Sequence, residues 1–171
     1  MKIQITGYSG CGKSTLAKAF ALHYNIPLLY LDTVQFYDDW QERPKEKQNQ
    51  IVTQFIEENN DWVIDGNYYK VAPQRFKKCD LYIFLNYNRF YCFIQCLLRY
   101  LKNKGQSRES CPCEEKFDHE FRSWILKDGR TQAMKEKHLR HFDEIQCEKY
   151  QFKSRRQLKK YLKQKNIKYP V

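Results

Sequence analysis

The chain has 171 residues, of which 42% are hydrophobic and 30% charged, and its formal net charge is +11 at pH 7. This length suffices for one compact core with a small mobile insertion and is short for two independent domains, so we expect a single domain over residues 1–171. The longest strongly apolar run, 90–98, has nine residues, about half of what a bilayer requires. This excludes a transmembrane span, and we expect no membrane partner.

The positive charge is concentrated at the C-terminus. Residues 149–171 contain nine Lys or Arg and no acid, so the first 148 residues are nearly neutral. We expect these lysines to form the solvated face of a helix, which makes nucleic acid a conceivable partner but not the favoured one. An odd number of cysteines, seven, and the absence of a charged-then-apolar leader argue against a secreted disulfide framework and predict a cytoplasmic protein.

The first elements carry the strongest motif of the chain. Residues 2–6 alternate apolar and polar side chains as a short strand does, and apolar residues recur at helical spacing after position 15. Between them lies a glycine-rich loop made of Gly7, Tyr8, Ser9, Gly10, Cys11, Gly12, Lys13, Ser14 and Thr15. It fits the phosphate-binding pattern Gly-x-x-x-x-Gly-Lys-[Ser/Thr], in which backbone amides cradle phosphates, the lysine reaches the β- and γ-phosphates and the hydroxyl ligates Mg²⁺. The loop therefore predicts binding of a nucleoside triphosphate.

Further strands and helices alternate along the chain. Buried strands are predicted at 27–32, 62–66 and 81–85, and a last strand at 145–152. Helices are expected at 44–58, 89–102, 114–127 and 131–140, with a final one capped by Ser154. The helix at 89–102 is expected to be buried through its apolar face, which consists of Phe90, Phe93, Ile94, Leu97, Leu98 and Leu101. This alternation predicts an α/β protein with a parallel sheet covered on both faces.

Two carboxylates are expected at the edge of the sheet where such folds bind ligands. Asp32 and Asp65 each end a predicted strand, at the same carboxyl edge as the glycine-rich loop. Asp65 is suited to hold a Mg²⁺-bound water beside the phosphates. Asp32 is suited either to touch the metal or to accept a proton from an acceptor hydroxyl.

Arginines outside the sheet are candidates for neutralising a migrating phosphoryl group, since this reaction is catalysed mainly by positioning and charge. The candidates are Arg43, Arg75, Arg89, Arg122 and Arg130. Arg130 is favoured because it follows Gly129 at the end of a presumed mobile helix. Arg43 is favoured because it lies in the irregular stretch after Asp32.

Several blocks of the sequence resemble the FlaR-related "DNA topology modulation" proteins over residues 1 to about 155. They include Gly7 to Ala17, Leu31-Asp32-Thr33, Trp62 to Tyr68 and Gly129-Arg130. That family resembles adenylate kinase, which implies a P-loop NTPase fold of three α/β/α layers, a five-stranded parallel sheet and a short lid. By this resemblance the glycine-rich loop binds ATP, residues 33–60 form an acceptor-binding insert, residues 104–130 form a lid-like segment, and Arg130 is a core or lid arginine.

The same resemblance leaves the acceptor open. Asp65-Gly66 corresponds to the start of the adenylate kinase Asp-Gly-Phe-Pro-Arg motif, but Asn67-Tyr68-Tyr69 replaces the part with the phosphate-gripping arginine, for which Arg43 or Arg75 is a substitute. The leading hypothesis is a kinase that uses ATP and Mg²⁺ to phosphorylate a nucleoside monophosphate, with Lys13, Asp32 and Arg130 as catalytic residues. Asp32, Arg43, Asp65 and Arg75 would bind the acceptor, and Ser14 and Asp65 the metal. The alternatives are a hydroxyl kinase of the shikimate or gluconate kinase type with Asp32 as base, and an ATP-binding regulator that contacts DNA.

Lesser features are expected to be structural. Cys11 lies near a helix N-terminus that would lower its pKa, but filling of the loop is the favoured role. Cys111 and Cys113 are too closely spaced for ordinary structural zinc, and His119 and His138 are expected on helix surfaces.

Overall fold

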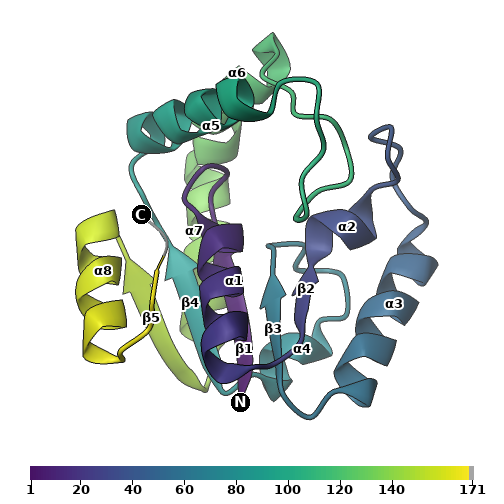
Figure 1. Cartoon of the computed structure of the whole chain (residues 1–171), viewed down its shortest axis with the longest axis vertical. Coiled ribbons are helices and arrows are strands. Elements are labelled where there is room, and N and C mark those ends of the chain that lie inside the picture. Colours follow the sequence, from purple (N-terminus) through teal and green to yellow (C-terminus); the bar gives the residue numbers. More distant parts are fainter. Residues whose placement is uncertain (170–171) are drawn as a thin grey trace.

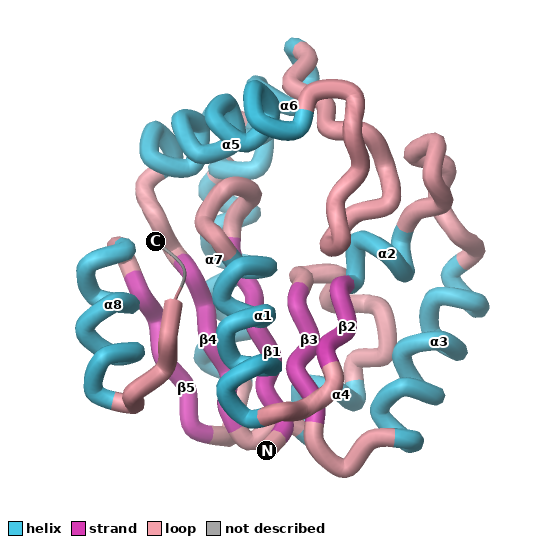
Figure 2. Tube along the Cα trace, viewed as in Figure 1, coloured by secondary structure: helices cyan, strands magenta, loops and turns pink. Residues whose placement is uncertain are grey.

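A computed structural model describes residues 1–169 of the chain. Five parallel strands form one sheet in the order β2-β3-β1-β4-β5, which Figures 1 and 2 show from the same side. The strands are β1 (Lys2–Gly7), β2 (Leu28–Tyr30), β3 (Trp62–Asp65), β4 (Leu81–Leu85) and β5 (Glu148–Phe152). β1 is central and pairs with β3 on one side and β4 on the other, so the loop that follows β1 lies in the middle of the carboxyl edge.

Helices cover both faces of this sheet. They are α1 (Lys13–Tyr24), α2 (Leu31–Gln35), α3 (Lys45–Glu58), α4 (Gln74–Lys78), α5 (Arg89–Asn103), α6 (His119–Leu126), the 3₁₀ turn η1 (Asp128–Arg130), α7 (Gln132–Glu144) and α8 (Arg155–Gln164). In Figure 1, α1 lies in front of the sheet, whereas α4 and α7 lie behind it. The result is the parallel sheet covered on both faces that the alternation of strands and helices predicted, with the three α/β/α layers and five strands that the family resemblance implied.

Polar and aromatic side chains on one face of the central strands pack against α7. Thr6 of β1 shares a hydrogen bond of 2.7 Å with the buried hydroxyl of Tyr82 on β4. The ring of Tyr82 packs against Phe142 of α7, with ring centroids 6.1 Å apart. Because side chains alternate along a strand, the neighbouring Ile5 and Ile83 point to the opposite face of the sheet.

Most predicted elements are present with shifted ends. β3 and β4 match the predicted strands, and the side chain of Ser154 accepts a hydrogen bond from the amide of Gln157, which confirms the cap of α8. The prediction for 27–32 is wrong at its end. β2 stops at Tyr30, and Asp32 lies in the first turn of α2, so its carboxylate is positioned by a helix rather than by a strand end.

The expectation that α5 is buried through its large apolar residues is wrong. Phe90, Ile94, Leu98 and Leu101 are all more than half exposed, while the fully buried residues of this helix are Cys92 and Cys96. The small cysteines allow α5 to approach the loop after β1 closely, and this turns the larger side chains outward. Sequence periodicity identified the amphipathic helix but assigned the wrong face to the core.

All seven cysteines lie within the described residues and are free. Among residues 1–169, none of the helices has the length and apolar character needed to cross a membrane.

Candidate functional site

The loop between β1 and α1 has a backbone shape suited to phosphate. Gly10 and Gly12 adopt left-handed φ values of 78° and 87°. A Cβ on Gly10 would collide with the carbonyl oxygen of Cys92 and the thiol of Cys96, so only glycine fits at this position of the loop. Because α1 begins at Lys13, the unpaired amides of its first turn and the positive end of its dipole lie at the loop.

Asn67 ties this loop to the next strand. Its Nδ2 donates to the carbonyl oxygen of Gly7 at 3.0 Å, and its Oδ1 accepts from the amide of Gly7 at 2.9 Å. The residue that follows Asp65-Gly66 therefore fixes the start of the phosphate-binding loop instead of gripping an acceptor. The sequence pattern did not reveal this role, because an asparagine after a strand is also a common turn residue.

Lys13, Ser14 and Asp65 converge beside the loop. The ammonium of Lys13 donates to the carbonyl of Tyr8 at 3.1 Å, and the hydroxyl of Ser14 donates to Oδ2 of Asp65 at 2.6 Å. Burial raises the pKa of Asp65 to about 6, although the charge of Lys13 and the hydrogen bond from Ser14 act in the opposite direction. The other oxygen of Asp65, Oδ1, is buried and has no hydrogen-bond partner among the described residues.

This pair fits Mg²⁺ brought in with a nucleotide. Mg²⁺ prefers oxygen ligands, keeps several waters and takes one or two protein groups plus phosphate oxygens. The Ser14 hydroxyl and the unpaired Asp65 oxygen provide such groups next to the phosphate-binding loop. Within residues 1–169 no group of three or more His, Cys, Asp or Glu residues is arranged so that it could hold a metal ion by itself.

Asp32 lies on the same cleft as Lys13, Ser14 and Asp65. The cleft has a volume of about 1220 Å³, more than the usual range of roughly 300–1,000 Å³ for a single small-molecule site. Its size suits two ligands. The hydroxyl of Tyr68 donates to Oδ1 of Asp32 at 2.6 Å, and burial together with this carboxylate raises the pKa of Tyr68 well above its ordinary value. Tyr68 stays protonated and orients the Asp32 carboxylate.

Two arginines that the sequence reasoning missed face the cleft from α5 and the following segment. Glu115 is buried, with Arg99 Nη2 at 2.6 Å and Arg108 Nε at 2.6 Å from its carboxylate. Arg108 lines the same cleft as Lys13, Ser14 and Asp65. A buried acid that holds two arginines toward a cleft is not visible in the sequence, because the three residues are separated by loops.

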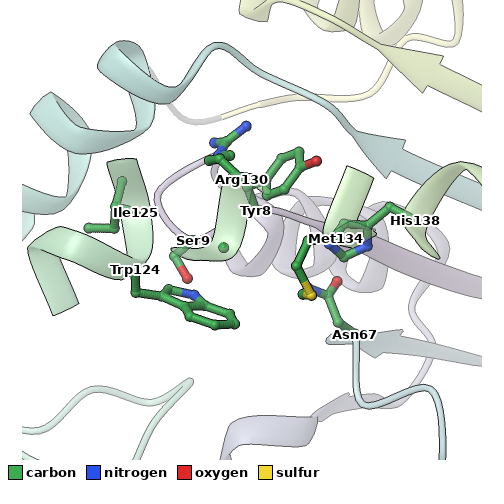
Figure 3. A pocket seen from close by; sticks show the side chains of 9 residues that line it. Tyr8, Ser9, Asn67, Trp124, Ile125, Arg130, Met134 and His138 are labelled. Atoms are coloured by element: carbon green, nitrogen blue, oxygen red, sulfur yellow. The ribbon is translucent and has the colours of Figure 1, made fainter. Parts of the chain in front are cut away.

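Arg130 lies against the loop itself. Its guanidinium stacks 3.4 Å from the ring centroid of Tyr8, and its Nη1 donates to the carbonyl of Tyr87 at 2.9 Å. Arg130 borders a small cavity of about 40 Å³. Figure 3 shows it there with Trp124 and His138, which also line the wall. The structure brings Arg130 to the loop, but to the side of it rather than onto the lining of the large cleft.

Arg43 and Arg75, which we expected to bind the acceptor, do not line the cleft. Arg43 donates from Nε to the carbonyl of Val34 at 3.1 Å and stacks on Tyr37. Arg75 is fully buried behind the sheet, where its guanidinium donates to Gln4 Oε1 and to the backbone carbonyls of Asn67, Tyr68 and Val71. Burial lowers the pKa of Arg75 to about 9. Arg75 is therefore part of the core, and its position in a short helix outside the strands gave no sign of this.

Two expectations about titrating groups are also wrong. Cys11 is buried, and burial raises the pKa of its thiol to about 12, whereas proximity to the N-terminus of α1 had predicted a lower value. His138 is not a surface residue: it is buried, its Nδ1 lies 2.6 Å from the hydroxyl of Tyr69, and burial lowers its pKa to about 4. His119 is exposed, as expected. The favoured role of Cys11, filling of the loop, agrees with its burial.

Comparisons with known proteins agree with this fold. The family model described as "ATPase family associated with various cellular activities (AAA)" matches residues 3–66, from β1 to the end of β3. A shikimate kinase from Bacteroides thetaiotaomicron is 23% identical, with a TM-score of 0.52 and coverage of 96% of this chain and 95% of that chain. A deoxyadenosine kinase from M. mycoides, solved with dCMP and dCDP as products, is 14% identical, with a TM-score of 0.51 and coverage of 97% and 99%. No curated protein sequence matches the chain significantly. The chain thus has the α/β fold of P-loop kinases.

Replacement of Arg75 by alanine should destabilise the protein by about 3–5 kcal/mol, because it leaves several buried acceptors without a donor. Urea unfolding followed by circular dichroism measures this loss. The matched control is Arg140→Ala on the exposed side of α7, which should stay within about 0.5 kcal/mol of wild type. Equal effects of the two substitutions would contradict a core role for Arg75.

His138 should make stability depend on pH. Its pKa is lower in the folded than in the unfolded state, so its contribution is fully present above pH 6.5 and is lost as the pH falls toward about 4. The difference in unfolding free energy between wild type and His138→Gln should therefore shrink by up to about 1.4 kcal/mol per unit of pH in that window. Denaturant titrations at several pH values test this. His119→Gln, on the exposed surface, is the matched control for the substitution itself, and a difference for His138→Gln that is constant with pH would refute the prediction.

Proposed function

We propose that this protein transfers the γ-phosphoryl group of ATP to a hydroxyl group of a small acceptor. The observation that carries the proposal is the position of Asp32: its carboxylate borders the same cleft as Lys13, Ser14 and Asp65 and is oriented by Tyr68. The two structural neighbours named as kinases support a phosphotransferase. Because these neighbours are only 23% and 14% identical to this chain, their names do not indicate which acceptor it phosphorylates.

The phosphate side of the reaction depends on charge. Lys13 and the loop amides would bind the β- and γ-phosphates, and Arg108, held by Glu115, would neutralise charge on the migrating group. Mg²⁺, held by Ser14 and through water by Asp65, would supply further charge neutralisation between the phosphates. Arg130, packed on Tyr8, would fix the loop and lie close to its bound phosphates.

The acceptor side depends on Asp32. Oδ1 of Asp32 accepts from Tyr68, which leaves Oδ2 to take the proton of the acceptor hydroxyl as its oxygen attacks the γ-phosphorus. ADP then leaves with the electrons of the broken P–O bond. A general base matters here because a neutral hydroxyl is a weak nucleophile at pH 7.

A nucleoside monophosphate acceptor is the second candidate. It was the leading hypothesis from the sequence, with Arg43 and Arg75 as phosphate-binding residues, and neither of these lines the cleft. Arg99, Lys102 and Lys137 do line it, and these cations favour an acceptor that carries its own phosphate. A monophosphate acceptor would not need Asp32 as a base.

Two segments beside the cleft have different proposed roles. We infer that residues 33–60, which contain α3, form the acceptor side, and that 104–130, with α6, act as a lid. We also infer membership of the FlaR-related group from the block Asp65-Gly66-Asn67-Tyr68. An effect on DNA is not favoured, because Leu158, Tyr161 and Leu162 of α8 are buried and its lysines form the solvated face.

Asp32→Asn should lower kcat for the best acceptor by roughly 10²–10⁴-fold while Mg·ATP affinity changes little, because only the proton acceptor is removed. The best acceptor is first found by a screen of nucleosides, nucleoside monophosphates and hydroxy acids with labelled ATP. Lys13→Ala is the reference for loss of ATP binding. Asp38→Asn, an exposed carboxylate of the same segment, should keep wild-type turnover.

Retained turnover in Asp32→Asn, or a screen in which only monophosphates are phosphorylated on their phosphate, would overturn the hydroxyl proposal in favour of the second candidate.

Asp65→Asn should abolish turnover yet stabilise the nucleotide-free protein at pH 7.5. The pKa of Asp65 is raised in the folded state, so its ionised form destabilises the fold above about pH 6, and removal of that charge should add on the order of 2 kcal/mol. Thermal unfolding without nucleotide measures the gain. The exposed Asp143→Asn should leave the Tm unchanged, and a Tm for Asp65→Asn at or below that of wild type would contradict a strained, buried carboxylate.

A further inference from the structure

The cleft that contains Asp32 is lined by aromatic rings from three separate parts of the chain. They are Phe36 and Trp40 from the segment around α2, Tyr68 from the loop after β3, and Phe121 and Trp124 from α6. A site for a sugar acid or a polyol would be expected to present mainly hydrogen-bonding groups. Concave sites lined by rings, with a few convergent polar groups, bind planar and partly apolar ligands.

Trp40 is held in this wall at a conformational cost. Its φ is 67°, a left-handed value that is a true outlier for a bulky side chain. Of the other three non-glycine residues with positive φ among residues 1–169, two are asparagines, which tolerate it, and the third is Ala72. Such strain clusters at ligand-binding sites, where the surrounding structure maintains it.

Contacts with the 104–130 segment maintain the position of Trp40. The indole Nε1 donates to the carbonyl of Glu114 at 3.1 Å, and the ring of Phe36 packs edge-on at 5.2 Å between centroids. The ammonium of Lys116 lies 5.2 Å from the indole centroid, and the thiol of Cys113 donates to the carbonyl of Tyr37 at 3.0 Å in the same loop. The polar edge of the indole is thus satisfied by the protein, so a ligand would meet its apolar ring.

Trp124 supplies a ring from the α6 side. A Cβ on Gly129 would lie 3.0 Å from Cε2 of the indole, so the absence of a side chain at Gly129 lets the ring lie against the backbone. The other side is open, since Trp124 is 45% exposed and lines the cleft. In Figure 3 the indole of Trp124 extends from α6 to lie close to Ser9, on the wall of the small cavity beside Arg130.

We propose that these rings form a subsite for a nucleobase, so that the acceptor is a nucleoside whose sugar hydroxyl reaches Asp32. This inference rests on the proposed function for its chemistry, but the subsite itself is testable by binding alone. Base–aromatic stacking would position the acceptor, and Asp32 with Tyr68 would receive the hydroxyl proton. Trp40 is the specificity-determining residue, because its ring lines the cleft and is held in place by the tight turn closed between Tyr37 and Gln41 and by its hydrogen bond to Glu114.

The test is binding of adenosine, cytidine and thymidine to the nucleotide-free protein by calorimetry, with shikimate and gluconate as non-aromatic hydroxyl compounds. At least one nucleoside should bind, and the two acids should not. Trp40→Leu and Trp124→Leu should each weaken nucleoside binding at least about tenfold, whereas Trp40→Phe, which keeps a ring, should stay within about threefold of wild type. Tyr37→Leu is the matched control, an exposed aromatic residue of the same loop that does not line the cleft.

ATP affinity, measured separately for every variant, distinguishes the two proposals and reports on folding. Unchanged ATP affinity with lost nucleoside binding in Trp40→Leu supports the subsite. Binding of shikimate or gluconate in place of nucleosides, or nucleoside binding that does not depend on Trp40, overturns the subsite and leaves the kinase proposal intact. Absence of ATP binding in the wild type overturns the kinase proposal, while nucleoside binding still decides on the subsite.

Discussion

The hydrogen bonds between the side chain of Asn67 and the backbone of Gly7 hold the centre of the site together. They join the end of β1 to the loop after β3, two neighbouring strands of the sheet. Lys13 and Ser14 follow Gly7 in the chain, while Asp65 precedes Asn67 and Tyr68 follows it. Together with the β1–β3 ladder, in which Ile5 pairs with Asp65, this amide side chain positions the phosphate-binding loop relative to the Asp65 carboxylate, and Tyr68 then orients the Asp32 carboxylate.

The basic side chains near the cleft differ in the partners that they already have. The ammonium of Lys13 meets only a backbone carbonyl, whereas Arg99 and Arg108 share the single carboxylate of Glu115, which offsets one of their two positive charges and leaves one. Arg75 is satisfied entirely within the core. The number of basic residues near a site is thus a poor guide to its affinity for phosphate, because burial and existing partners decide which cations are available.

Sequence reasoning succeeded where the chemistry is local. The phosphate-binding loop depends on glycines and a lysine at fixed spacing in adjacent positions, and β3 and β4 are short apolar runs whose burial on both faces follows from composition. It failed where long-range packing decides. The orientation of α5 depends on how closely Cys92 and Cys96 let it approach Gly10, and the burial of Arg75 and His138 depends on acceptors and rings from distant segments. Nothing in the sequence indicates that Trp40 lines the cleft, because its position depends on contacts with the loop before α6.

The contact of Gly10 with α5 has a mechanical consequence. Gly10 has no side chain, and the space where its Cβ would lie is filled by the backbone of Cys92 and the sulfur of Cys96. The same helix continues to Arg99 and then into the segment that carries Arg108 and Glu115. Because α5 is packed against Gly10 and also carries Arg99, a shift of this helix would displace the loop and the arginine together.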